Sequence, residues 1–169
     1  MNLSPQAAVQ EMASFSPQVE AEVEMHIAKY PPDRRRSAIL PILFIVQRER
    51  NYIDTPGAAY VAHKLGLEVV DVWETATFYS MLNLKPVGRH HIQICKTLSC
   101  KIMGEPQITE HVCSKLGIKP GETTPDGKYT VSLVECLGSC GTAPMFQIGF
   151  DYYEDLTTEK VDQILNSLS

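Results

Sequence analysis

Four of the five cysteines in this 169-residue chain lie in two short segments, and this pairing constrains the fold more than any other feature. The thiols of Cys95 and Cys100 have four residues between them, and those of Cys136 and Cys140 have three. Apolar residues alternate with polar ones just before each pair, at Ile92 and Ile94 and at Tyr129, Val131 and Leu133. This alternation predicts a strand that enters each loop. Two such strands side by side in one sheet would bring four thiolates to a single point.

Several kinds of site remain open on the residues alone. Thiolates are soft ligands that select zinc, copper(I) or iron–sulfur clusters. Gaps of four and three residues are at or near the limit for structural zinc, whereas a wider loop suits a cluster of two irons, each held by two thiolates. The plant-type ferredoxin spacing is absent. A thiol–disulfide enzyme is a further hypothesis, although the chain lacks the Cys-x-x-Cys of catalytic thioredoxins.

The composition favours a cytosolic protein with a packed core. Apolar residues make up 44% of the chain, and a net charge of −5 argues against a nucleic-acid partner. The longest apolar run, residues 38–46, is too short to span a membrane and contains Pro41. Residues 1–5 lack the basic and apolar regions of a signal peptide. In the cytosol, cysteines more often bind metal or carry redox chemistry than form disulfides.

The first 85 residues are predicted to form a helical bundle. Residues 1–15 are expected to be mobile or loosely docked. Pro41 lies inside the second predicted helix and should bend it or mark its true start. The third helix should end at Gly66, which suits a left-handed C-cap. Four residues are expected to cap helix N-termini: Ser16, Asp33, Thr55 and Asp71.

The charges of this region argue against a DNA-reading helix-turn-helix. Between residues 54 and 80 there are four acids and one lysine, whereas a DNA reader must neutralise phosphates. The cluster at residues 34–36 is expected to be a solvated helix end rather than a salt-bridged docking surface. Three aromatic residues are expected to be core or interface anchors: Trp73, Phe78 and Tyr79.

A second domain is predicted from residue 86 to residue 169. Residues 85–88 contain Pro and Gly and are typical of a linker. Strands are expected at residues 90–95, 129–135 and 145–150, with turns and at most one short edge strand at 118–128. Helices are expected to begin at Pro106 and Thr157. Periodicity alone does not single out one fold for this order of elements.

The residues around both cysteine pairs resemble a known family. Residues 91–100 and 135–144, with 76–81 and 85–88 upstream, resemble the thioredoxin-like 2Fe–2S family formed by the E subunits of bacterial NADH:quinone oxidoreductase, respiratory complex I. The resemblance runs from about residue 15 to the end of the chain. It implies an α+β fold, in which a helical bundle precedes a thioredoxin-like 2Fe–2S ferredoxin domain with a mixed sheet and flanking helices.

The resemblance also implies a cofactor and its ligands. One 2Fe–2S cluster would be held by Cys95, Cys100, Cys136 and Cys140, and a low potential follows from four thiolates and the negative charge added on reduction. Gly138 and Gly141 would let the backbone turn close to sulfur. The remaining thiol, on Cys113, is expected to be partly buried and not a ligand. The five histidines are expected to be structural. Thioredoxin-like folds often have a cis proline near the position of Pro144, so a cis Ala143–Pro144 bond is a further hypothesis.

The function implied by the resemblance is electron transfer within a larger enzyme. The chain has no G-x-G-x-x-G motif or P-loop, so NADH and FMN would lie on a partner, the flavin- and NADH-binding subunit of complex I. The cluster would exchange single electrons with that flavin. It would lie off the main electron path, where it could store one flavin electron. This chain would have no independent active site.

Alternatives to this function remain open. Equivalent subunits serve NAD-linked hydrogenases and formate dehydrogenases, and a structural zinc-binding module belongs to a different class. The expected location is cytoplasmic, peripheral on the cytoplasmic side of the inner membrane through partner subunits.

Overall fold

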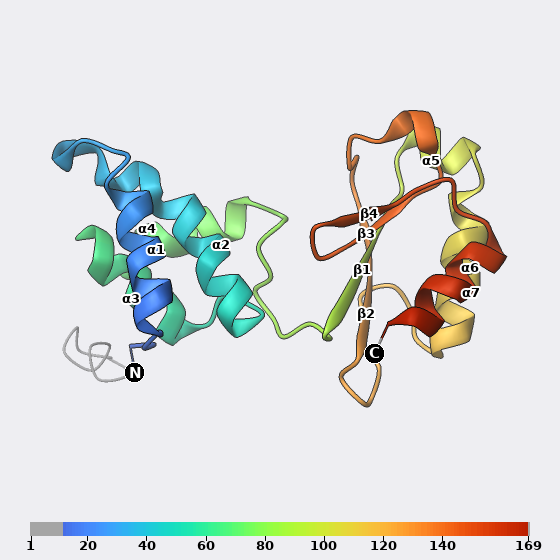
Figure 1. The fold of residues 1–169 in the computed structure, drawn as a ribbon, viewed down its shortest axis with the longest axis horizontal. Coiled ribbons are helices and arrows are strands. Elements are labelled where there is room, and N and C mark those ends of the chain that lie inside the picture. The colour runs from blue at the N-terminus through green and yellow to red at the C-terminus, as the bar shows by residue number, and fades with distance from the viewer. Residues whose placement is uncertain (1–11, 169) are drawn as a thin grey trace. The chain divides into compact units, whose positions relative to one another are not determined.

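The computed structural model describes residues 12–168, and the chain divides into two compact units, Met1–Pro86 and Val87–Ser169 (Figure 1). The first unit is helical, and the second combines a four-stranded sheet with helices. The predicted α+β class is therefore confirmed. Within residues 12–168, no helix is both long and apolar enough to cross a membrane.

The first unit is a bundle around one apolar core. Each helix contributes buried residues, and Val23, Ile42, Leu43, Val61 and Val72 are wholly inaccessible to solvent. The described part of this unit contains helices and no strands, so the apolar stripes of its helices are buried against one another. The elements are α1 (Pro17–Ile27), the 3₁₀ helix η2 (Pro32–Ala38), α2 (Ile39–Arg50), α3 (Thr55–Leu65) and α4 (Val69–Phe78).

Two predicted helix ends are confirmed. The Ser16 hydroxyl accepts a hydrogen bond from the Val19 N–H at 3.3 Å and caps α1. Gly66 ends α3 with a φ of +65°, in the left-handed region. Pro41 lies in the first turn of α2, where a missing N–H costs nothing, so it marks the true start of that helix.

Three predicted caps are wrong. Asp33 lies inside η2, and α2 begins only at Ile39. Asp54 rather than Thr55 caps α3, since its carboxylate accepts from the Gly57 N–H at 2.8 Å. Glu68 rather than Asp71 caps α4, with Asp71 as the second member of a capping box.

The segment before α1 is only partly described. Of residues 1–15, which were expected to be mobile or loosely docked, residues 1–11 lie outside the described part. Ala13 is buried, and its N–H donates to the Pro56 carbonyl at 3.1 Å. The rings of Phe15 and Tyr60 meet edge to face.

The basic cluster at residues 34–36 and the aromatic residues of α4 follow only in part the environments that the sequence predicts. Arg34 and Arg36 are solvated, but Arg36 also forms an ion pair with Asp71 at 3.1 Å, which links η2 to α4. Trp73 packs against the core, as expected. Phe78 is 80% exposed and therefore lies outside the core. It is the last residue of α4, beyond the buried residues of that helix.

The second unit is built on a sheet with the order β2-β1-β3-β4. The pair β1–β2 is parallel, and the other two pairs are antiparallel. The predicted strand at residues 145–150 is shorter, because Gly149, with a φ of +62°, turns the chain into a further strand that was not predicted. The strands are β1 (His90–Cys95), β2 (Tyr129–Val134), β3 (Phe146–Ile148) and β4 (Asp151–Tyr153).

Two helices, α6 and α7, cover one face of this sheet (Figure 1). Their apolar residues share a core with Ile92, Ile94 and Phe146 of the strands. Residues 118–128 form turns and a single bridge between Thr123 and Thr130, as expected. The Ala143–Pro144 bond is cis, which confirms that hypothesis. The helices are α5 (Leu98–Ile102), α6 (Glu105–Leu116), the 3₁₀ turn η3 (Cys140–Thr142) and α7 (Thr158–Ser167).

The cap of α3 gives a testable prediction about the first unit. The carboxylate of Asp54 accepts from the Gly57 N–H and pairs with the Arg50 guanidinium, whose Nε lies 2.9 Å away. Asp54→Ala removes both contacts, so we expect equilibrium urea unfolding of the full chain to show a loss of about 1–2 kcal/mol at pH 7. Asp54→Asn keeps an acceptor for the cap and should lose less.

The pH dependence of the same site has a defined sign. The Arg50 guanidinium holds the pKa of Asp54 below its ordinary value. The stabilisation is therefore fully present above the unfolded pKa of about 3.9 and is lost as the pH falls through the folded pKa. The stability difference between wild type and Asp54→Asn should shrink over that range. A difference that grows on acidification would contradict the assignment.

Candidate metal centre

The parallel pairing of β1 and β2 brings the two cysteine loops together. The strands run in register from His90 opposite Tyr129 to Cys95 opposite Val134, so both end at the same edge of the sheet. Cys95 is the last residue of β1, and Cys136 follows β2 by two residues. The expectation that both loops lie at one end of one sheet is confirmed.

The first cysteine pair is buried. Cys95 is 2% exposed and Cys100 is 1% exposed, and both pack with Ala143 and Met145 in a small apolar cluster. Cys100 lies within α5, a short helix that the sequence did not predict. The Thr97 Oγ1 lies 3.3 Å from the Cys95 Sγ. Strand, helix and packing thus fix this pair.

The second cysteine pair is exposed. The sulfurs of Cys136 and Cys140 lie 3.7 Å apart. The Gly138 N–H donates to the Cys136 Sγ at 3.4 Å. Gly138 has a φ of +87°, a conformation that favours glycine, which supports the predicted close approach of its backbone to sulfur. No Cβ-bearing residue adopts this turn without strain.

Hydrogen-bond donors cross between the loops. Burial raises the pKa of Cys95, but donors outweigh it: the Thr97 hydroxyl and N–H and the Leu137 N–H of the second loop lower that pKa below its ordinary value. The Ser99 hydroxyl of the first loop likewise acts to lower the pKa of Cys140 in the second loop. A thiolate in this site therefore has donors aimed at it from both loops.

The thiols also influence one another. Burial, together with the neighbouring Cys95 thiol, raises the pKa of Cys100 to about 11. The adjacent Cys136 sulfur raises the pKa of Cys140. Adding several thiolate charges at one place is unfavourable unless a cation or a metal group balances them.

The donor set consists of two thiol pairs rather than one compact group. Among residues 12–168, no group of three or more His, Cys, Asp or Glu side chains is placed to hold a metal ion. Four soft thiol donors, two from each loop, nevertheless fit in their chemistry the ligand requirement of a cluster of two irons. Cys95, Cys100, Cys136 and Cys140 are the residues that could hold it.

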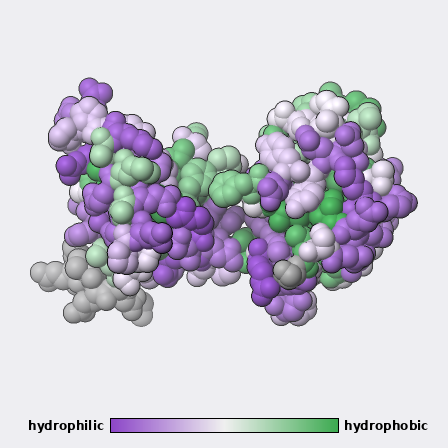
Figure 2. Space-filling view, in the orientation of Figure 1, coloured by the Kyte–Doolittle hydropathy of each residue, from purple (hydrophilic) through white to green (hydrophobic). Residues whose placement is uncertain are grey.

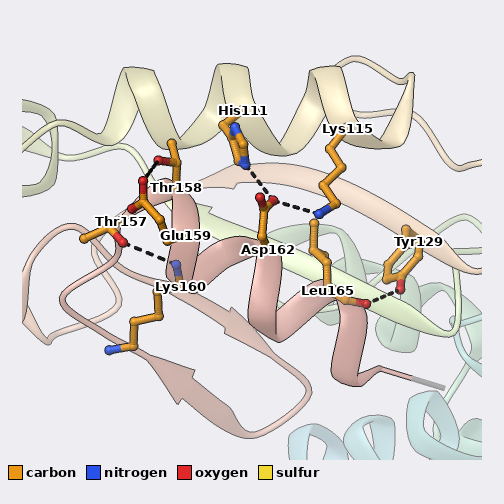
Figure 3. Close-up of polar contacts among 9 residues, drawn as sticks. All are labelled: His111, Lys115, Tyr129, Thr157, Thr158, Glu159, Lys160, Asp162 and Leu165. Carbon is orange, nitrogen blue, oxygen red and sulfur yellow. Dashed lines mark hydrogen bonds and ion pairs between the residues drawn. The ribbon is translucent and has the colours of Figure 1, made fainter.

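The other predicted non-ligands lie outside this set. Cys113 is partly buried on α6 and packs against the core of the sheet. The ring of His91 bonds the Ser132 hydroxyl at 2.8 Å, and burial lowers its pKa. His111 faces Asp162 of α7 at 2.7 Å, and Lys115 shares that carboxylate (Figure 3). These histidines join elements of the second unit.

Sequence reasoning missed the polar residues that surround the second loop. Ser139, Thr142, Tyr152 and Glu154 form hydrogen bonds with one another or with the loop backbone. Tyr152 and Glu154 follow an expected strand, but no pattern in the sequence indicates that they turn back toward the cysteines.

The fold and the paired thiols are typical of ferredoxins, and comparison with known proteins gives the particular class. Residues 23–169 match the family described as thioredoxin-like [2Fe-2S] ferredoxin. The chain belongs to that family, since the match covers most of its length. Its cofactor is accordingly a 2Fe–2S cluster, which supplies one-electron chemistry.

Relatives in bacteria support this family assignment. The chain is 49% identical over 144 residues to the NADH-quinone oxidoreductase E subunit of Rickettsia felis, covering 85% of this chain and 86% of the relative. It is 45% identical over 146 residues to the NADH-quinone oxidoreductase E 2 subunit of Rhizobium meliloti, covering 86% of each.

A solved structure shares the fold. In the crystal structure of an NAD+-reducing [NiFe]-hydrogenase in the air-oxidized state, one chain superposes with a TM-score of 0.67 at 22% identity. The match covers 75% of this chain and 22% of that one. At this identity the likeness concerns the fold alone.

Gly138 provides a test of the second loop. Gly138→Ala places a side chain at a φ of +87°, with an expected strain of about 1–2 kcal/mol, and should at least double the rate at which a chelator bleaches the visible absorption of the cluster. Gly121→Ala is the matched control: its φ is +92° and an added Cβ meets nothing within 4 Å. Equal bleaching rates in wild type and Gly138→Ala would show that this turn does not govern retention of the cluster.

Proposed function

We propose that Cys95, Cys100, Cys136 and Cys140 hold the 2Fe–2S cluster, and that the chain is the electron-transfer subunit of an NADH:quinone oxidoreductase. The observation that carries the ligand assignment is the parallel β1–β2 pair, since it delivers both thiol pairs to one edge of the sheet. The relatives named as E subunits of NADH-quinone oxidoreductase support the wider function.

The protein's own groups suit a cluster that gains negative charge. Four thiolates, two sulfides and two ferric ions carry a total charge of −2, which becomes −3 on reduction. The Gly138 N–H donates to the Cys136 sulfur, and the Thr97 hydroxyl and the Leu137 N–H lower the pKa of Cys95. These groups would offset part of that charge. The first pair is buried and the second is exposed, so the cluster would lie at the surface with one side open to a partner.

We further propose that the partner is a flavin- and NADH-binding subunit. The described residues offer an exposed apolar face on α5, where Leu98 is 75% exposed and Ile102 is 74% exposed. Leu98 and Ile102 are four residues apart and therefore share one side of the helix. Apolar surface is visible at the end of the second unit that carries α5 (Figure 2). This helix also contains Cys100, so a protein docked there would lie next to the cluster.

The domain division and the host complex belong to the same proposal. We assign residues 1–85 to a helical domain and residues 86–169 to a ferredoxin domain, in keeping with the division of the chain after Pro86. The names of the relatives favour a quinone-reducing complex over an NAD-linked hydrogenase, because the hydrogenase likeness extends only to the fold. Association with the cytoplasmic side of the membrane would then occur through partner subunits.

The ligand assignment is tested on protein purified without oxygen. Iron, sulfide and zinc are quantified with visible and low-temperature EPR spectra on one sample. We expect two irons and two sulfides per chain and a spin-half signal after reduction with dithionite. Cys136→Ser should lose or strongly weaken the cluster, whereas Cys113→Ser, the matched control, should leave the visible spectrum unchanged. Zinc without sulfide, or an intact cluster in Cys136→Ser, would overturn the assignment.

The docking face is tested by charge substitution. Leu98→Glu with Ile102→Glu should weaken binding to the co-expressed flavin subunit at least tenfold, because the apolar contact would be replaced by buried charge. Phe150→Glu is the control, since Phe150 is 87% exposed on the turn between β3 and β4. Affinity is measured by interferometry, with the visible spectrum confirming that the cluster is retained. Loss of binding in the Phe150 variant alone would locate the interface elsewhere.

A further inference from the structure

Residues 152–156 run beside the second cysteine loop and bond to it repeatedly. The Tyr152 hydroxyl donates to the Leu137 carbonyl at 2.6 Å. The N–H groups of Asp155 and Leu156 donate to the carbonyls of Thr142 and Pro144, at 2.8 Å and 3.0 Å. The loop is thereby attached along its length to the end of β4 and the residues that follow it.

One carboxylate lies at the centre of these contacts. The hydroxyls of Ser139 and Thr142 both donate to Oε1 of Glu154, with Thr142 at 2.7 Å. Ser139 precedes Cys140 directly, and Thr142 follows it by two residues. Their two hydroxyls also lie 2.9 Å apart. The Ser139 and Thr142 hydroxyls hold the pKa of Glu154 below its ordinary value, so the group is charged at neutral pH.

The two cysteine pairs differ in what holds them. Cys95 and Cys100 are fixed by β1, by α5 and by burial in an apolar cluster. Cys136 and Cys140 are exposed, and the elements around them are a loop and the three-residue turn η3. Hydrogen bonds must therefore fix the position of the second pair, whereas packing fixes the position of the first.

We propose that Glu154 is a positioning residue for the cluster: it anchors Ser139 and Thr142 on either side of Cys140, and its negative charge lowers the cluster's midpoint potential. The proposal rests on the proposed assignment of Cys136 and Cys140 as ligands. The anchoring follows from the shared carboxylate oxygen. The effect on the potential follows because a fixed negative charge near the cluster disfavours the addition of an electron.

Three substitutions separate anchoring from charge. Glu154→Gln keeps an acceptor oxygen but removes the charge. The midpoint potential should therefore rise, while the rate of cluster loss should stay close to that of the wild type. Thr142→Val removes one donor and keeps the charge, so cluster loss should accelerate. Glu154→Ala removes both contributions, and chelator-driven loss of visible absorption should be at least fivefold faster.

A double variant tests whether the two residues act together. If Thr142 acts through Glu154, then Glu154→Ala with Thr142→Val should lose its cluster no faster than Glu154→Ala alone. Glu110→Gln is the control for charge, because Glu110 is an exposed acid on α6 and its substitution should change neither loss rate nor potential. All measurements use the full chain with its cluster, by anaerobic bleaching, EPR-monitored redox titration and far-UV circular dichroism.

The outcomes are distinct. Wild-type loss rates in Glu154→Ala and Thr142→Val would overturn the anchoring, and an unchanged or lower potential in Glu154→Gln would overturn the charge effect. If Glu154→Ala fails to fold, Glu154→Gln and Thr142→Val still decide both parts. A wild-type chain without iron and sulfide, or an intact cluster in Cys136→Ser, would instead refute the proposed ligands, whatever the Glu154 variants do.

Discussion

Parallel hydrogen bonding between β1 and β2 underlies the whole site. These strands are separated by α5, α6 and a series of turns, yet they pair residue for residue from His90 to Cys95. A parallel pair needs such a crossover, and as a result the C-terminal ends of both strands lie at the same edge of the sheet. The core under α6 and α7 holds the two strands in register, so packing far from the thiols decides where the thiols meet.

The site combines a fixed half and an adjustable half. Burial makes the first thiol pair costly to ionise, and donors such as the Thr97 hydroxyl and the Leu137 N–H counter that cost. The second pair keeps its solvent exposure, and its geometry depends on Gly138 and on hydrogen bonds to residues 152–156. A cluster held by these four thiols, as proposed, would present one side to a partner without placing the whole of its charge in a dry interior.

The helical unit shows which local features a sequence can specify. Ser16 and Gly66 were predicted because each stands alone as a capping residue at the end of an apolar stripe. Where two capping residues compete, the choice depends on contacts: the Asp54 carboxylate accepts from the Gly57 N–H and also pairs with Arg50, and Asp54 rather than Thr55 is the cap. The strand β4 was not predicted, because a strand of three residues is too short to show an alternation that distinguishes it from a loop.

Local sequence was enough to indicate the paired cysteines, the strands that lead into them and the family resemblance, because spacing and alternation are local properties of the chain. Only the folded chain shows that the first pair is buried and the second exposed, since burial depends on Ala143 and Met145, which lie far along the chain from Cys95 and Cys100. The fold also brings Glu154 to Ser139 and Thr142. Such contacts follow from the turn at Gly149 and the packing of the sheet, which no short stretch of sequence records.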